Sequence, residues 1–180
     1  MLISEKLQQF YIENNLSEDG GENDAYFYLT FKLFSIKLPN SDFRKKVVHI
    51  HDIQHILYNK DITWKGEAFI AGWEIATGIW KHFPINLMSL WAMGFAFLIH
   101  PKEVLKGYKK GLQVKGIIDL QIPKEEIINY DIEIVRSKIK KEIPSPYKVH
   151  FYSFWILISQ LVFWFPLVVV FAIIFYFIQP

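Results

Sequence analysis

The feature that most constrains this chain is a long apolar run near its C-terminus. Residues 151–178 carry no charged side chain. The non-hydrophobic residues within the run are Ser153, Ser159, Gln160 and Pro166. About twenty apolar residues suffice to cross the hydrocarbon core of a bilayer, and a domain of this size has too little interior to bury a segment of this length. We therefore expect a transmembrane helix over 151–178.

The distribution of charge agrees with a membrane anchor. Residues 1–100 carry 9 Lys/Arg and 11 Asp/Glu, whereas residues 101–150 carry 11 and 7. Four lysines precede the apolar run: Lys138, Lys140, Lys141 and Lys148. Positive charge beside a span favours the cytoplasmic side, so we expect a bacterial inner-membrane protein with its domain in the cytoplasm. The formal net charge of +2 is too small to indicate nucleic acid as a partner.

The remainder of the chain predicts helices. Residues 1–40 predict a short helix, an acidic loop at 17–24 and a segment at 25–38 that is compatible with helix or strand. A basic amphipathic stretch covers 101–116. The other expected helices cover 43–58, 67–78, 84–99 and 124–143. The fold class predicted is therefore all-α, with a helical domain at 1–143, a linker at 144–150 and the transmembrane helix at 151–178.

One spacing of residues indicates chemistry. His51, Asp52 and His55 are followed, after eleven residues, by Glu67. On a helix His51 and His55 lie one turn apart on one face, so that two imidazoles can hold one cation. The chain has no cysteine, so any metal must be held by histidine and carboxylate. Two histidines with one or two carboxylates and an open position are typical of a catalytic metal site, for which Zn²⁺ and Fe²⁺ are both suitable.

Better-known metal motifs fit less well. HExxH metalloproteases place a glutamate after the first histidine, where this chain has Asp52. Phosphohydrolases with a His-Asp pair need a further histidine well upstream, and no histidine precedes His49. Di-iron bundles need paired ExxH motifs, and this sequence has none. A single helical histidine is more often an ordinary core or surface residue, but a pair with this spacing is a less easily accidental pattern.

The pattern HDxxH, eleven residues and then Glu resembles the motif of the Coq4 family of ubiquinone-biosynthesis proteins. His51, Asp52, His55 and Glu67 match it at every fixed position. Three further stretches are similar to that family: Gly66-Glu67 with 73–78, the basic Gly-containing stretch 106–111, and 135–139. The resemblance covers about residues 20–143, and the apolar tail is an addition to it.

The resemblance implies a helical protein that acts at a membrane. It implies a divalent metal, zinc with Fe²⁺ as the alternative, on His51, Asp52, His55 and Glu67. These residues would serve removal of the C1 carboxylate, with hydroxylation, from a polyprenylated hydroxybenzoate. Glu74, seven residues after Glu67, could orient a ligand or face solvent. The apolar helix at 84–99 could line a groove for a prenyl tail, although core packing is the plainer interpretation of its aromatic residues.

Two alternatives remain open at this point. One is a non-catalytic scaffold that binds prenylated quinone precursors and organises the other biosynthetic enzymes. The other is a membrane-anchored metallohydrolase. The partners expected from the resemblance are membrane lipid, a polyprenylated quinone precursor and other enzymes of quinone biosynthesis, and a homodimer is compatible with it.

Overall fold

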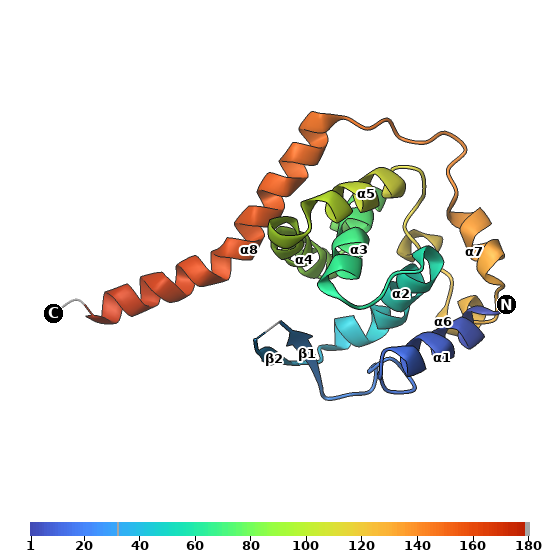
Figure 1. The fold of residues 1–180 in the computed structure, drawn as a ribbon, viewed down its shortest axis with the longest axis horizontal. Helices are drawn as coiled ribbons and strands as arrows, with labels where there is room; N and C mark the ends of the chain where they lie inside the picture. The colour runs from blue at the N-terminus through green and yellow to red at the C-terminus, as the bar shows by residue number, and fades with distance from the viewer. Residues whose placement is uncertain (32, 179–180) are drawn as a thin grey trace. The chain divides into compact units, whose positions relative to one another are not determined.

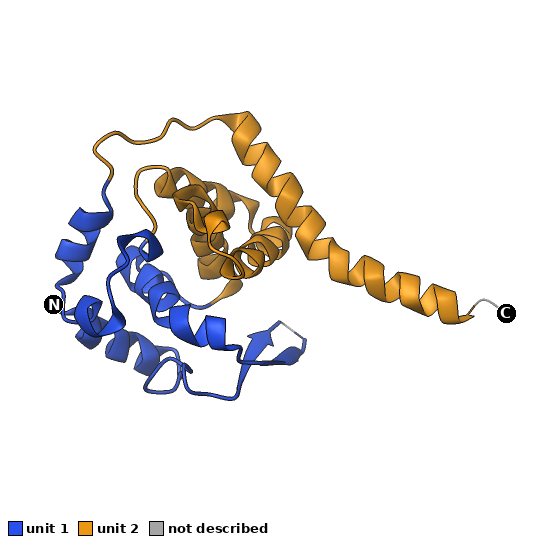
Figure 2. Ribbon diagram, turned by 180° about the vertical axis from the view of Figure 1, so that it is seen from behind, with its two compact units in different colours: residues 1–62, 117–140 blue, residues 63–116, 141–180 orange. Residues whose placement is uncertain are grey.

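The structure is a computed structural model that describes residues 1–31 and 33–178. It is mostly helical and carries one long apolar helix at its C-terminal end, which confirms the predicted fold class (Figure 1). The chain forms two compact units (Figure 2). Unit 1 comprises Met1–Ile62 and Ile117–Lys140, and unit 2 comprises Thr63–Gly116 and the chain from Lys141 onward. The boundaries at 143 and 150 remain predictions.

Unit 1 is built around two helices, α1 (Ile3–Glu13) and α2 (Asp42–Tyr58). Its other elements are β1 (Tyr26–Thr30), β2 (Ser35–Pro39), the 3-10 helix η2 (Ile118–Leu120), α6 (Lys124–Ile127) and α7 (Ile132–Ile139). Its core side chains include Ile3, Leu7, Phe10, Ile53, Leu57, Ile127 and Val135. Backbone bonds from the start of α1 to the turn before α7, among them Ile3 N to Tyr130 O at 2.9 Å, bring these distant parts of the sequence together.

The structure decides the segment at 25–38 and corrects the one at 124–143. The first is an antiparallel hairpin in which Phe27 faces Leu38. A single helix over 124–143 is wrong, because the chain leaves helical geometry between α6 and α7. Asp131 then starts α7, since its Oδ1 accepts a hydrogen bond from Glu133 N at 2.9 Å. Aspartate is a preferred helix N-cap because it satisfies an otherwise unpaired amide.

Unit 2 packs α3 (Trp64–Thr77) closely against α5 (Pro101–Gly111). The contact depends on glycine: a Cβ added to Gly107 would lie 1.9 Å from Phe69 O, and one added to Gly72 would lie 2.2 Å from Val104 O. Thr63 begins α3, accepting a hydrogen bond from Gly66 N. Gly78 ends it with φ 108°, a conformation that favours glycine. The 3-10 helix η1 (Ile79–Lys81) and α4 (Ile85–Ile99) follow.

The long helix α8 (Val149–Ile178) combines a packed part and an exposed part. Near its first third it contacts α4: Gln160 Nε2 donates to Gly94 O at 2.8 Å, and a Cβ added to Gly94 would lie 2.4 Å from Ser159 O. Beyond Phe163 its large apolar side chains are exposed. Among the described residues, α8 is the helix long and apolar enough to cross a membrane, with a mean hydropathy of 2.8.

The segment expected as a linker is tied to the C-terminal end of α5. Ser145 N donates to Leu112 O at 2.9 Å, and Lys141 N donates to Gln113 O at 3.1 Å. The Tyr108 ring then contacts the rings of Tyr147 and Tyr152, with centroids 6.4 and 5.0 Å away. These contacts fix the start of α8 against α5 within unit 2.

Candidate metal centre

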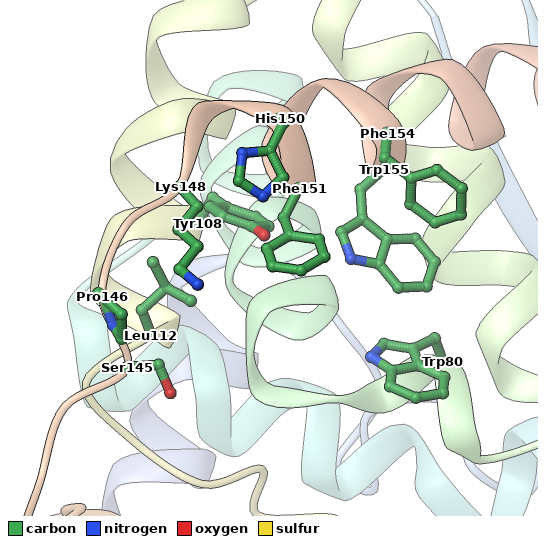
Figure 3. A pocket seen from close by; sticks show the side chains of 10 residues that line it. All are labelled: Trp80, Tyr108, Leu112, Ser145, Pro146, Lys148, His150, Phe151, Phe154 and Trp155. Atoms are coloured by element: carbon green, nitrogen blue, oxygen red, sulfur yellow. The ribbon is translucent and has the colours of Figure 1, made fainter.

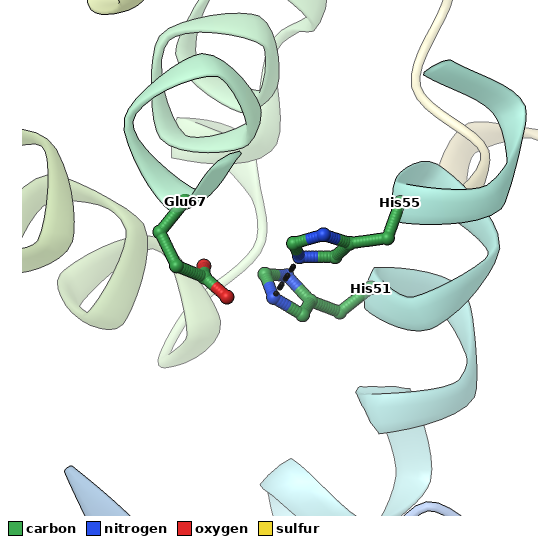
Figure 4. A group of neighbouring side chains, drawn as sticks. All are labelled: His51, His55 and Glu67. Atoms are coloured by element: carbon green, nitrogen blue, oxygen red, sulfur yellow. Dashed lines mark hydrogen bonds between the residues drawn. The ribbon is translucent and has the colours of Figure 1, made fainter. Parts of the chain in front are cut away.

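His51 and His55 lie one turn apart on α2 and their rings converge, as their spacing predicts. The two Nε2 atoms are 3.2 Å apart, and the ring centroids are 4.8 Å apart with an interplanar angle of 66° (Figure 4). Asn59, in the left-handed conformation, ends the helix just beyond the pair. The regular turns of α2 therefore present two ring nitrogens to the same point.

The separation of the two nitrogens suits a shared metal. Zinc binds histidine nitrogen at about 2.0–2.1 Å in tetrahedral geometry, which places two such nitrogens about 3.3 Å apart. The observed 3.2 Å between the Nε2 atoms of His51 and His55 is close to that value. A direct hydrogen bond between two imidazoles would give a similar distance. The donor set of two imidazoles is thus compatible with a bound cation.

The orientation of His55 is set by its other ring nitrogen. His55 Nδ1 lies 3.2 Å from Lys60 O, which can only accept a hydrogen bond. Nδ1 must then carry the proton, and in the neutral ring this leaves a lone pair on Nε2. The Phe10 ring packs beside His55, with centroids 5.6 Å apart, and His55 is 1% exposed. A backbone carbonyl that orients a histidine in this way is typical of metal-bound imidazoles.

Asp52 is buried beside the pair and has a different hydrogen-bond partner. Its Oδ2 accepts a hydrogen bond from the hydroxyl of Tyr11 on α1 at 3.0 Å. Burial raises the pKa of Asp52, an effect opposed by the nearby charges of His51 and His55 and by the Tyr11 hydrogen bond. Burial also raises the pKa of Tyr11, as does the neighbouring Asp52.

Gly20 is part of this buried contact. Its φ is 68°, and an added Cβ would lie 2.7 Å from Asp52 Oδ2 and 2.8 Å from the Tyr11 hydroxyl. Sequence reasoning identified Gly20 only as part of an acidic loop, and it did not single out Tyr11. The left-handed glycine was visible as a turn signal, but nothing in the spacing pairs Tyr11 with a residue 41 positions later.

Glu67 belongs to the first turns of α3 in unit 2 and is half-buried. Its amide donates to Thr63 O at 2.8 Å, within the capped start of the helix. Residues 59–63 join α2 to α3, so the chain between the histidines and Glu67 is short. Figure 4 draws Glu67 with the two histidines.

Glu74 and the aromatic residues of α4 have structural partners inside unit 2. Glu74 is buried and accepts a hydrogen bond from Ser89 Oγ at 2.6 Å, which excludes the solvent-facing one of the two alternatives for this residue. The ring of Trp91 lies 5.5 Å from that of Phe163, and the ring of Phe95 lies 4.4 Å from that of Trp64. These contacts are ordinary packing, in line with the plainer of the two interpretations of this helix.

A polar pocket of about 500 Å³ in unit 1 is lined in part by His55. Lys6, Gln9 and Glu13 of α1 line it as well, together with Asn59 and neighbouring residues of the turn after α2. His55 is thus the member of the candidate centre that borders this polar pocket, whereas His51 and Glu67 are not among the residues that line it.

Fold and site together describe a mostly helical protein with paired imidazoles on α2 and an apolar helix of membrane-spanning length. Comparison with protein-family models, with curated proteins and with solved structures finds no match for this chain. The resemblance to the Coq4 family therefore remains a prediction from the HDxxH pattern and the residues around it.

Proposed function

We propose that His51, His55 and Glu67 hold one divalent metal ion and that α8 attaches this site to a membrane. The observation that carries the proposal is the 3.2 Å separation of the His51 and His55 Nε2 atoms, with His55 Nδ1 held by Lys60 O. Two imidazoles and a carboxylate leave a coordination position open. Zinc is the first candidate and Fe²⁺ the second, because this donor set accepts both.

We assign Asp52 a positioning role in this centre. Its carboxylate accepts the Tyr11 hydrogen bond, and its burial next to His51 and His55 lets its charge stabilise their orientation. A direct metal bond from Asp52, as the family motif implies, is the alternative. The variant Asp52→Asn separates the two roles, because losing a direct ligand reduces metal affinity more than losing a residue that only orients the ligands.

We further propose that the chemistry is C1 decarboxylation, with hydroxylation, of a polyprenylated hydroxybenzoate in quinone biosynthesis. Support comes from the HDxxH pattern with Glu67 and from an apolar helix that would hold the protein where such a substrate dissolves. A bound metal would supply a Lewis acid for an anionic oxygen. His51, His55 and Glu67 would hold it.

Metal analysis of the full-length protein tests the first part of this proposal. Purified protein should contain about one zinc or iron per chain by elemental analysis, and the double variant His51→Ala/His55→Ala should contain almost none. His82→Ala is the matched control, because it removes a histidine of unit 2 that is not in the motif. Equal metal content in all three proteins would refute the metal site.

Turnover separates the three functions considered for the chain. Metal-loaded protein in detergent, given a prenylated hydroxybenzoate and dioxygen as the oxidant, should release CO₂ and yield a product in which a hydroxyl group replaces the ring carboxylate. Binding of the prenylated compound without turnover would instead indicate a scaffold, and cleavage of an ester or peptide would indicate a hydrolase. Quinone levels in a deletion strain complemented with each variant test whether the same residues are needed in cells.

We also propose that the helical domain lies on the cytoplasmic side of a bacterial inner membrane. The lysines before α8, including Lys138, Lys140 and Lys148, support this orientation. Protease added to the outside of right-side-out vesicles should leave the domain intact. Digestion of the domain under those conditions would show that it lies on the outer side of the membrane, and the metal proposal would be unaffected.

A further inference from the structure

An apolar pocket of about 660 Å³ lies in unit 2 where α8 begins (Figure 3). Trp80 of η1, Phe151 and Trp155 of α8 and Leu112 after α5 form its apolar wall, and Lys148 lines it as well. Trp80 is 43% exposed and Phe151 is 53% exposed. Large aromatic surfaces that stay open in this way usually mark a place where another apolar molecule binds.

The walls of this pocket are held in place by contacts inside unit 2. The rings of Trp80 and Trp155 lie 5.5 Å apart, and those of Tyr108 and Tyr152 lie 5.0 Å apart. The segment that carries Lys148 is bonded to the end of α5 through Ser145 N and Leu112 O. The pocket therefore needs little ordering before it accepts a ligand, which reduces the entropic cost of binding.

Its place along α8 matches the headgroup region of a bilayer. Beyond its packing on α4, α8 carries exposed apolar side chains from Trp164 to Ile178, and this part would enter the hydrocarbon core. Trp155 lies before that stretch, and tryptophan is enriched at membrane interfaces because its ring is apolar while its N–H prefers a polar partner. With α8 across a membrane, the pocket would open where phospholipid headgroups meet acyl chains.

The charge around the pocket is positive. Lys148 lines it, and Lys109 and Lys110 lie in the last turn of α5, at the same end of the pocket, whereas Lys106 is paired with Glu103. Lys109 lies over the Tyr147 ring, 4.9 Å from its centroid. In the following segment, the positive charge of Lys141 is balanced by the negative charge of Glu142. An anionic ligand is therefore favoured over a neutral one.

We propose that this pocket binds an anionic phospholipid of the host membrane. One acyl chain lies along Trp80, Phe151 and Trp155, and the phosphate lies near Lys148. The inference rests on the membrane attachment proposed above, but not on the metal centre or its reaction. The ligand is a structural lipid, distinct from a prenylated substrate, and it fixes unit 2 at the surface of the membrane.

Native mass spectrometry of the full-length protein from nanodiscs tests the site. The nanodiscs contain equal amounts of phosphatidylglycerol and phosphatidylcholine. The chain should retain one phosphatidylglycerol in several-fold excess over phosphatidylcholine. Lys148→Gln should reduce that preference about fivefold, the effect of one lysine beside an anionic membrane. Leu112→Trp should remove the bound lipid by filling the pocket. Lys102→Gln, an exposed lysine at the other end of α5, should change neither.

Each contrary result overturns the proposal in a distinct way. Equal retention of the two lipids, or phosphatidylglycerol kept by both Lys148→Gln and Leu112→Trp, would show that the pocket does not select an anionic lipid. Displacement of the phospholipid by an added prenylated hydroxybenzoate would make the pocket a substrate site instead. A chain that does not enter nanodiscs would overturn the membrane attachment as well, whereas the metal analysis would stand.

Discussion

The hydroxyl of Tyr11 on α1 donates a hydrogen bond of 3.0 Å to Oδ2 of Asp52 on α2, and both side chains are buried. This bond joins residues 41 positions apart and fixes the carboxylate next to the histidine pair. Gly20 closes over it, since any side chain at that position would overlap both groups. The bond gives the candidate centre a support outside α2.

Tyr11→Phe should weaken both the fold of unit 1 and the metal centre. The variant removes a hydrogen bond to the buried carboxyl group of Asp52, and intramolecular hydrogen bonds contribute about 1 kcal/mol or more. Metal affinity should fall by about tenfold, the lower end of losses from outer contacts of a metal site. Thermal unfolding followed by circular dichroism and a competitive zinc titration check the two effects. Tyr28→Phe on the exposed hairpin is the control.

Asp52→Asn distinguishes a positioning residue from a ligand. If Asp52 orients His51 and His55, metal affinity should fall about 10–100-fold and metal should still bind at high concentration. If Asp52 is a ligand, the loss should equal that of His55→Ala. Titration of each variant with zinc, after folding is checked by circular dichroism, compares them directly. A loss as complete as that of the histidine variant contradicts the positioning role.

Gly107→Ala should strongly destabilise unit 2. The added Cβ would lie 1.9 Å from Phe69 O, a backbone atom of α3 that cannot move without separating the helices. Overpacking of this kind costs about 1–3 kcal/mol and sometimes more, so the unfolding midpoint in detergent should fall by several degrees. Lys106→Ala, an exposed neighbour on the same helix, should leave it nearly unchanged.

Two truncations test the division of α8 into a packed and an exposed part. Ending the chain after Pro166 keeps the contacts of Ser159, Gln160 and Phe163 with α4 and should release a folded protein from the membrane. Ending it after Lys148 exposes the side of α4 that Gln160 and Phe163 cover, and should give aggregated protein. Sedimentation without detergent and size-exclusion chromatography compare the two. A well-folded soluble chain ending at Lys148 would show that the packing of α8 on α4 is dispensable.

Metal removal should affect the His51–His55 region more than the rest of the chain. Two imidazoles 3.2 Å apart without a cation must share a proton or separate. A chelator should therefore increase hydrogen exchange at the end of α2 and in the turn up to Lys60, while the α3–α5 contact in unit 2 stays protected. Uniform protection with and without chelator would indicate that the pair is a simple hydrogen bond.

The sequence by itself determined the helical class, the apolar C-terminal helix and the shared face of His51 and His55, because these depend on composition and on spacing within one helix. It left the hairpin at 25–38 undecided and wrongly joined α6 to α7, since local propensity says little about caps and strand pairing. Only the tertiary structure decided that Tyr11 and Gly20 meet Asp52, that Glu74 is buried on Ser89, and that α8 packs on Gly94 before it becomes exposed. Those contacts join residues distant in the chain, where no periodicity links them, so they follow from packing alone.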